Sequence, residues 1–144
     1  MFRKILYPTD FSDVSKKALD YIKQLKKGGA EAVILVHVID QRGIRAIEWS
    51  AAATALKMEQ ELMAQAGEDL KKIEEILKKW GFQVETRLEI GFPVREILNV
   101  EKEEDVSVIV IGSHGKSNLE EMFLGSVSEK VARKCTKPIL IIKR

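Results

Sequence analysis

The apolar residues of this chain occur in two patterns, short continuous runs and longer segments in which apolar residues recur every three or four positions. Continuous runs rich in Val and Ile are typical of strands buried on both faces, whereas the wider spacing is typical of amphipathic helices. Four continuous runs predict strands, at Ile5–Tyr7, Ala32–Ile39, Val106–Ile111 and Pro138–Ile142. Val84–Ile90 alternates with charged residues instead, which predicts a fifth strand with one face exposed to water.

Four helical segments separate these strands. Val14–Leu25 has apolar residues at helical spacing and ends before two glycines that act as a stop signal. Thr54–Trp80 carries one apolar stripe among charged residues. Because this stripe is shorter than the three to four heptads of a coiled coil, it predicts a helix that faces the core. A short helix is expected over Pro93–Leu98, and the last helix begins near Ser126.

Strands that alternate with helices are the signature of parallel sheets with right-handed crossovers. The pattern therefore predicts a single α/β domain over residues 1–144, doubly wound in three α/β/α layers, with a five-stranded parallel sheet of order 3-2-1-4-5. The connection Asp40–Ala53 has no regular pattern and is long enough to cover a site. Its Ile44, Ile47 and Trp49 are expected to close on a ligand, to pack against another subunit, or to pack as a helix.

Composition limits the classes of partner. The 24 Lys and Arg residues nearly balance the 22 Asp and Glu residues, and a formal net charge of +2 argues against a nucleic acid or an anionic membrane. A single cysteine, Cys135, excludes an intrachain disulfide and is expected in the core. With no N-terminal signal pattern and no apolar run of membrane-spanning length, we expect a cytoplasmic protein. Abundant Lys and Glu with few Asn and Cys are also typical of thermophilic proteins.

Ligands of open α/β sheets bind beyond the C-terminal ends of the strands, where the strand order reverses. The predicted order places this crevice between the first and fourth strands, beside Pro8–Asp10, Val38–Asp40 and Gly112–Gly115. The two glycines that bound the last segment permit a close approach of the backbone to a ligand. Gly125-Ser126 lies at a helix start, where free N–H groups attract anions. These residues predict a phosphate-binding loop, with ordinary turns as the alternative.

Three familiar nucleotide-site motifs do not fit this chain. Gly115-Lys116-Ser117 is like the end of a P-loop, but the glycine that this motif needs five residues earlier is replaced by Val110. No Gly-x-Gly-x-x-Gly follows the first strand, which argues against a dinucleotide-binding Rossmann domain. Gly91 stands where a receiver domain would have its acidic phosphoacceptor.

Gly112-x-x-Gly115, followed after nine residues by Gly125-Ser126, resembles the nucleotide-binding motif of the universal stress protein family. The resemblance extends over essentially the whole chain, including Ile5–Ser12, His37–Asp40, Gly91-x-Pro93 and Pro138–Ile142. It implies a five-stranded α/β fold, usually a homodimer. Because this sequence keeps the glycines and the serine, it resembles the ATP-binding branch of the family. We expect the dimer to form through the last strand, which lies at an edge of the sheet with unpaired backbone groups.

The resemblance also implies a role for each matched residue. It places Asp10 near the adenosine and the Val38 backbone against the adenine. Around the ribose and phosphates it places the motif residues, Gly112, Gly115, Gly125 and Ser126. Residues that flank these positions complete the expected site, namely Pro8, Thr9, Ser113, His114 and Val127. Helix capping is the alternative role of Asp10 and Ser126.

The expected cofactor is ATP, or AMP or ADP in its place, together with Mg²⁺. No metal site built from protein ligands alone is visible, and Asp10, Asp13 and Asp40 are expected to support the ion through waters. We interpret His37 as a core histidine because it lies in a buried run. His114 either contacts phosphate or is solvated.

Three functions remain open at this point. A regulatory switch, in which bound ATP stabilises one conformation or assembly and is hydrolysed slowly at most, is the best supported. An ATP hydrolase or nucleotidyl-transfer enzyme would use Asp10, Asp40 or His114 as acid or base, but a complete set of groups for phosphoryl transfer is not visible. In a structural dimerisation module, the glycines would only shape turns. The sequence does not identify a downstream protein partner.

Overall fold

The structure, a computed structural model, describes residues 1–113 and 125–144. Strands and helices alternate as predicted, with one additional helix, α2. In chain order the elements are β1 (Lys4–Pro8), α1 (Asp13–Lys27), β2 (Ala32–Asp40), α2 (Gln41–Glu48), α3 (Ala52–Lys79), β3 (Gln83–Gly91), α4 (Pro93–Glu104), β4 (Val108–Gly112), α5 (Ser126–Lys134) and β5 (Ile139–Ile142). Within the described ranges, no helix combines the length and the apolar character needed to span a lipid bilayer.

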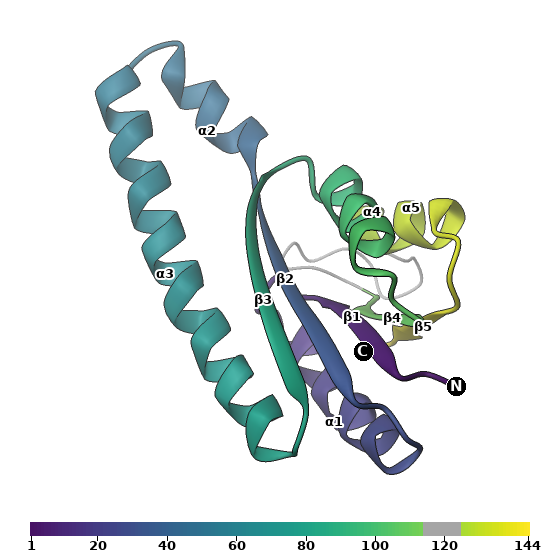
Figure 1. The fold of residues 1–144 in the computed structure, drawn as a ribbon. Helices are drawn as coiled ribbons and strands as arrows, with labels where there is room; N and C mark the ends of the chain where they lie inside the picture. Colours follow the sequence, from purple (N-terminus) through teal and green to yellow (C-terminus); the bar gives the residue numbers. More distant parts are fainter. Residues whose placement is uncertain (114–124) are drawn as a thin grey trace.

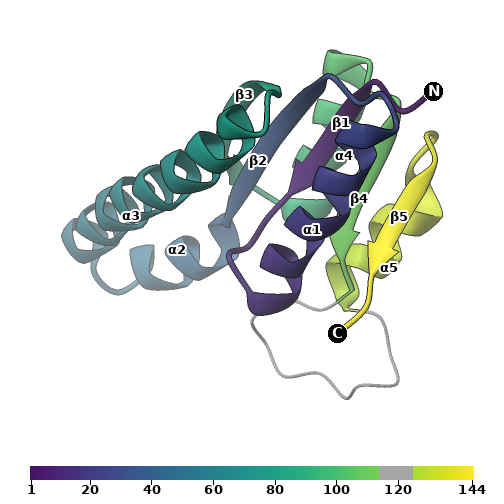
Figure 2. The same ribbon diagram turned by 90° about the horizontal axis from the view of Figure 1, so that it is seen from below.

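The five strands form one parallel sheet in the order β3-β2-β1-β4-β5, which confirms the predicted fold. Helices α1 and α3 cover one face of the sheet, and α4 and α5 lie side by side on the other (Figure 1 and Figure 2). Because all strands run the same way, their C-terminal ends meet at one edge, called here the C-terminal edge. The turn after β1 and the residues after β4 both leave the sheet at this edge.

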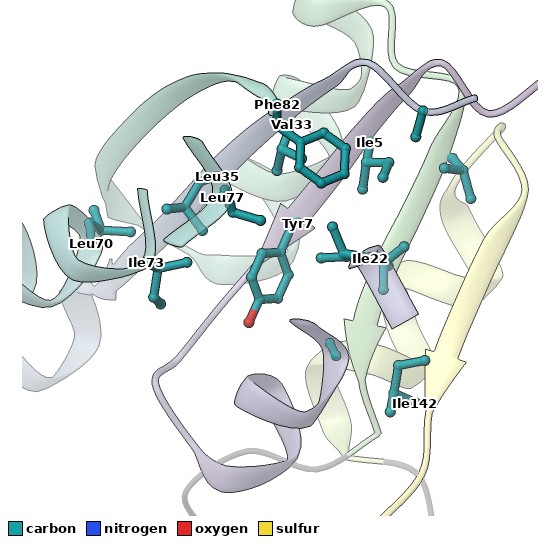
Figure 3. Packing of buried hydrophobic residues seen from close by; sticks show 14 residues of the cluster. Ile5, Tyr7, Ile22, Val33, Leu35, Leu70, Ile73, Leu77, Phe82 and Ile142 are labelled. Carbon is teal, nitrogen blue, oxygen red and sulfur yellow. The ribbon is translucent and has the colours of Figure 1, made fainter. Parts of the chain in front are cut away.

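The continuous apolar runs arise because successive residues of an inner strand point to opposite faces of the sheet, and both faces are covered. Ile5 and Tyr7 of β1 belong to the buried cluster beneath α1 and α3, which is drawn in Figure 3. Leu6, which lies between them in sequence, belongs to the cluster on the opposite face with Ile97 of α4 and Val131 of α5.

The prediction of an irregular connection at Asp40–Ala53 is wrong, because most of this segment is helix α2. The Asp40 side chain caps the helix by accepting a hydrogen bond from the N–H two residues later. Ile44 is buried in a small cluster between α2, α3 and the end of β2, and Ile47 packs against it. Two apolar residues are too few for a helical period to be recognised in the sequence. Of the three alternatives, packing as a helix is therefore observed for Ile44 and Ile47, whereas Trp49 is exposed.

Helix α2 and the N-terminal half of α3 extend beyond the sheet, away from α4 and α5, and form a helical arm (Figure 1 and Figure 2). The predicted stripe of α3 is buried where the helix crosses the sheet, at Ala66, Leu70, Ile73 and Leu77. On the arm, Leu56 is 59% exposed and Met63 is 37% exposed, and Trp49 at the end of α2 is 94% exposed. The core-facing prediction therefore applies to the C-terminal half of α3.

Helix α4 continues beyond its predicted end to Glu104, because Val100 and Glu101 are buried. It stops at Asp105, whose φ of 48° lies in the left-handed region. The Glu101 carboxylate accepts hydrogen bonds from the backbone N–H groups of the turn at Thr136-Lys137, at 2.7 and 2.9 Å. This contact ties the end of α4 to the turn that leads into β5.

The face of β3 that the sequence predicts to be exposed is only partly so. Arg87 is half-buried and forms ion pairs with Glu89 of its own strand and with Glu103 and Glu104 of α4, at N···O distances between 2.7 and 3.5 Å. The charge of Arg87 is thus neutralised where β3 meets α4.

Candidate functional site

The turn between β1 and α1 holds Asp10 at the C-terminal edge of the sheet. Its Oδ1 accepts a hydrogen bond from the Ser12 N–H at 3.0 Å, and Ser12 caps α1 by accepting one from the Ser15 N–H at 3.2 Å. Phe11 has a φ of 64°, in the left-handed region that residues other than glycine rarely occupy. Strain of this kind is common at functional sites. The helix cap is therefore Ser12, and Asp10 is a half-buried turn residue.

A network of buried hydroxyl groups stabilises this turn through hydrogen bonds. The Thr9 side chain accepts hydrogen bonds from the Phe11 N–H at 3.1 Å and from the Ser15 hydroxyl at 2.6 Å. The Tyr7 hydroxyl donates to the Ser15 carbonyl oxygen, and burial raises the pKa of Tyr7 above its ordinary value. Thr9 is only 5% exposed, and Pro8 before it is buried. These two predicted site residues therefore shape the turn, and Asp10 is the one that reaches the surface.

His37, near the end of β2, fastens that strand to the same turn. Its Nδ1 lies 2.7 Å from the Thr9 carbonyl oxygen, and its ring centroid lies 4.6 Å from that of Phe11. The ring is half-buried, so that both the contacts and the location agree with a structural histidine.

Val38 follows on β2, and its backbone lies just past the end of β1. The Val36 carbonyl accepts the Thr9 N–H at 2.9 Å, so the backbone of Val36 faces β1. Because this direction alternates from residue to residue along a parallel strand, the Val38 backbone faces the same side. The register between β1 and β2 ends at the pair Pro8 and Val36. The Val38 N–H and carbonyl therefore point toward the space beyond the last residue of β1.

The residues on either side of segment 114–124 lie together at the C-terminal edge. The Gly125 N–H donates to the Ser113 carbonyl oxygen at 2.5 Å, and the Ser128 hydroxyl donates to the same oxygen at 2.9 Å. The Ser113 N–H donates to the Ile142 carbonyl at 2.8 Å, which ties this junction to β5. The two described parts of the glycine motif are thus adjacent in space. His114 and Gly115, two further residues of the predicted site, lie outside the described residues.

Gly112 has a packing role that the sequence does not reveal. A Cβ atom at this position would lie 3.1 Å from both the Ser15 backbone nitrogen and Val14 Cγ1. The missing side chain therefore lets the first turn of α1 approach the end of β4. A role of Gly112 beside ribose or phosphate stays a prediction.

The N-terminus of α5 lies at this junction and has no side-chain cap. Its N-cap is Gly125, so the capping role considered for Ser126 is not observed. Ser126 is exposed and Val127 packs partly into the cluster beneath α4 and α5. The first N–H groups of a helix have no partner within it, and the helix dipole makes this end positive. The arrangement is suited to an anion.

Asp40 forms an ion pair with Arg42 of the helical arm. Both of its carboxylate oxygens accept hydrogen bonds from the Arg42 guanidinium, at 2.6 to 3.2 Å, and these bonds lower the pKa of Asp40. Among residues 1–113 and 125–144, no three His, Cys, Asp or Glu side chains are grouped closely enough to hold a metal ion. Asp10, Asp13 and Asp40 are therefore not assembled into one directly coordinating site.

A groove that the sequence does not predict begins beside Ser126 and runs between α4 and α5. Its volume is about 610 Å³, and the residues that line it include Phe92, Arg95 and Lys130. A sequence signal exists in the basic residues one turn apart on each helix. Spacing within a helix, however, does not specify which other helix its face will meet.

The model of the universal stress protein family matches residues 1–143. The universal stress protein MJ0577 of Methanocaldococcus jannaschii is 38% identical over 156 residues, an alignment that covers 100% of this chain and 96% of the relative. The universal stress protein YxiE of Bacillus subtilis is 37% identical over 152 residues, covering 99% and 100%.

Solved structures agree with these relationships. The structure of MJ0577 matches with a TM-score of 0.90 and 42% identity, covering 100% of this chain and 97% of that one. A universal stress protein from Archaeoglobus fulgidus, solved in complex with dAMP, shares the fold with a TM-score of 0.71 at 23% identity, covering 99% and 98%. With a family model matched over nearly its full length and relatives aligned from end to end, the chain belongs to the universal stress protein family.

Proposed function

We propose that this chain binds an adenine nucleotide, either ATP or its shorter forms ADP and AMP, at the C-terminal edge between β1 and β4. The observation that carries the proposal is the Gly125–Ser113 hydrogen bond, which brings the glycine motif to the uncapped N-terminus of α5. Backbone N–H groups at the positive end of a helix bind phosphate oxygens. The exposed Ser126 adds a hydroxyl donor at the same end.

The adenosine occupies the other side of the crevice in this proposal. The half-buried Asp10 carboxylate accepts hydrogen bonds from ribose hydroxyls, and the Val38 backbone, which faces the space beyond β1, pairs with the adenine edge. Mg²⁺ accompanies a bound triphosphate, held mainly by the phosphates and through waters by Asp10 and Asp13.

Two more distant family members support the ligand class. The Archaeoglobus fulgidus protein was solved with dAMP, and another universal stress protein was solved with cAMP. Both ligands contain an adenine base and a single phosphate. The choice of ATP for this chain therefore rests on its own glycine motif, which resembles that of the ATP-binding branch.

The nucleotide acts as a regulatory switch in this proposal. Gly112 packs against α1, and Ser113 is hydrogen-bonded to β5, so the ligand would lie where three elements meet. A ligand stabilises whichever conformation binds it more tightly. Nucleotides with different numbers of phosphates would thereby favour different arrangements of the β5 edge.

Identification of the small molecule released from the purified protein tests the ligand directly. Calorimetry with ATP, ADP, AMP and NAD follows, and NAD is expected to bind much more weakly because the Rossmann fingerprint is missing. If NAD binds as tightly as ATP, the proposed adenosine pocket is wrong. Steady ATP turnover by the purified protein would identify an enzyme instead of a switch.

Two variants test which residues bind the phosphates of the nucleotide. Ser126→Ala removes one hydrogen bond to a charged group and is expected to weaken ATP binding by about 1.5 to 3 kcal/mol, roughly tenfold to a hundredfold. Ser50→Ala, at an exposed serine of the arm, is the matched control and should bind ATP as wild type does. From the sequence we also expect Gly115→Val to reduce ATP binding by roughly a hundredfold or more with little change in fold. Wild-type affinity in both Ser126→Ala and Gly115→Val would remove this junction from the site.

A further inference from the structure

The groove between α4 and α5 is strongly basic although the chain as a whole is nearly neutral. Of the described residues that line it, five carry a positive charge and none carries a negative one. The five are Arg42, Arg95, Lys102, Lys130 and Lys134. A volume of about 610 Å³ lies within the usual range for small-molecule sites.

The basic residues come from one face of each helix. Arg95, Asn99 and Lys102 are spaced four and three residues apart on α4, and Lys130 and Lys134 are four residues apart on α5. Residues at this spacing share a helix face. Both faces are exposed and border the same groove, so the cations form two facing rows. The rows run roughly 10 Å along α4, from Arg95 to Lys102, and roughly 6 Å along α5, from Lys130 to Lys134.

The carboxylates of these two helices point elsewhere. Glu96 lies beside Gly91, and Glu101 is bonded to the turn before β5. Glu103 and Glu104 pair with Arg87 of β3, and Glu129 pairs with Arg133. As far as the described residues extend, none of Arg95, Lys102, Lys130 and Lys134 belongs to an ion pair. Arg42 is different, because Asp40 neutralises it. Four positive charges therefore face one groove, and no carboxylate among residues 1–113 and 125–144 forms an ion pair with them.

The walls favour a small, densely charged anion over a peptide or a nucleic acid. The exposed side chains are the cations with Asn99 and Ser126, whereas the apolar lining residues are half-buried, and Val94 and Val127 already pack into the core. Protein partners need apolar or aromatic anchors that enter open pockets, and single-stranded nucleic acids need exposed aromatic rings for stacking. The Phe92 ring is engaged with the Arg95 guanidinium, which lies 5.1 Å from its centroid.

We propose that the groove between α4 and α5 binds a linear oligophosphate, at a site that adjoins the nucleotide crevice at Ser126 and extends away from it along the two helices. Lysines bind phosphates as compact point charges, and the guanidinium of Arg95 can hold two phosphate oxygens at once. Two rows of cations match a chain that carries a negative charge on every phosphate. The site does not depend on the proposed nucleotide function, because its distal half, Lys102 and Lys134, lies at the C-terminal ends of the two helices.

Calorimetric titration with inorganic tripolyphosphate tests the site. The double variant Lys102→Gln/Lys134→Gln should bind this probe roughly tenfold more weakly than wild type. The matched control Lys71→Gln/Lys72→Gln changes the net charge equally, on an exposed face of α3, and should bind within about twofold of wild type. Melting curves of both variants check that the fold is retained.

Each measurement distinguishes the proposed site from one alternative. Absence of tripolyphosphate binding, or equal weakening in both double variants, overturns the site. ATP should bind to Lys102→Gln/Lys134→Gln as it does to wild type. A parallel loss of ATP affinity would mean that the groove holds the tail of the nucleotide and not a separate phosphate chain. A hexaglutamate peptide that binds as tightly as tripolyphosphate would show that the groove selects for charge alone, against the proposed phosphate chemistry.

Discussion

At the scale of single residues, several residues at the C-terminal edge are of types that suit two roles, to contact a ligand and to support the fold. Thr9 and Ser15 carry hydroxyls of the kind that contact ligands, yet they bond to each other and hold the strained turn at Phe11. Gly112 has the freedom that a ligand-binding loop needs, yet it also makes room for α1. Asp10 and Ser126 remain accessible from this edge. A substitution that reduces ligand binding must therefore be compared with its effect on stability.

Tyr7→Phe tests the structural role alone, because the Tyr7 hydroxyl supports the turn and is too buried to reach a ligand. Loss of its hydrogen bond is expected to lower the free energy of unfolding by about 0.5 to 1.5 kcal/mol at neutral pH. Burial raises the pKa of Tyr7 in the folded state above its ordinary value of about 10. The stability that the neutral hydroxyl contributes is therefore complete below about pH 10 and is lost as the pH rises through the folded pKa.

Urea unfolding of both proteins from about pH 8 to about pH 11 measures this effect. The stability difference between wild type and Tyr7→Phe should shrink as the pH rises, since lysine titration is common to both. Tyr21→Phe, at a residue 38% exposed, is the control and should show a small difference that does not vary with pH. A Tyr7→Phe difference that is constant with pH would contradict the buried, protonated hydroxyl.

At the scale of elements, α2 shows how a short helix depends on its surroundings. Isolated helices of this length are marginal in water, so α2 requires both the Asp40 cap and the burial of Ile44 against α3. The arm that α2 forms with α3 lies away from the sheet, and its outer end exposes Trp49 and Leu56. The arm is therefore expected to be less stable than the sheet.

Ile44→Ala is expected to open α2 locally. Loss of the buried side chain costs about 2 kcal/mol or more, which corresponds to roughly thirtyfold faster amide hydrogen exchange over residues 41–48. Exchange in β1 and β4 should be unchanged, because these strands do not contact α2 through Ile44. Ile47→Ala, at a half-buried position, should have a smaller effect on the same amides. Unchanged protection of α2 in Ile44→Ala would show that its cap alone maintains the helix.

At the scale of the whole molecule, β5 is an edge of the sheet and leaves backbone groups available to a second chain. Ile142 is buried, whereas Leu140 is 37% exposed on this strand. A two-fold symmetric pair would place the same edge of each chain against the other. Because Ser113 is bonded to Ile142, the same strand also reaches the candidate site.

We predict a homodimer through β5, measured by light scattering at micromolar concentration. Removal of the last six residues, 139–144, should give monomers or insoluble protein. Leu140→Lys adds a charge to the exposed edge without removing a core residue and should give a folded monomer. Lys71→Leu, on the exposed face of α3, should remain dimeric. A full-length protein that is monomeric under these conditions would refute the predicted interface.

The sequence by itself determined the order of strands and helices, the parallel sheet and the edge at which the candidate site residues lie. These follow from local signals, because burial on both faces requires continuous apolar strands such as residues 33–36, and a helix start is marked by residues such as Gly125 and Ser126. Helix α2 was not predicted, because two buried isoleucines do not make a recognisable helical period.

Tertiary structure alone decided which polar groups support the fold and which stay accessible. Thr9 is buried by hydrogen bonds to α1, Gly112 is needed where α1 crosses β4, and the basic groove exists only because α4 and α5 meet. Each of these features joins segments far apart in the sequence. Hydrophobic period specifies the face that a segment buries, but the geometry of packing between segments specifies what that face and its neighbours will touch.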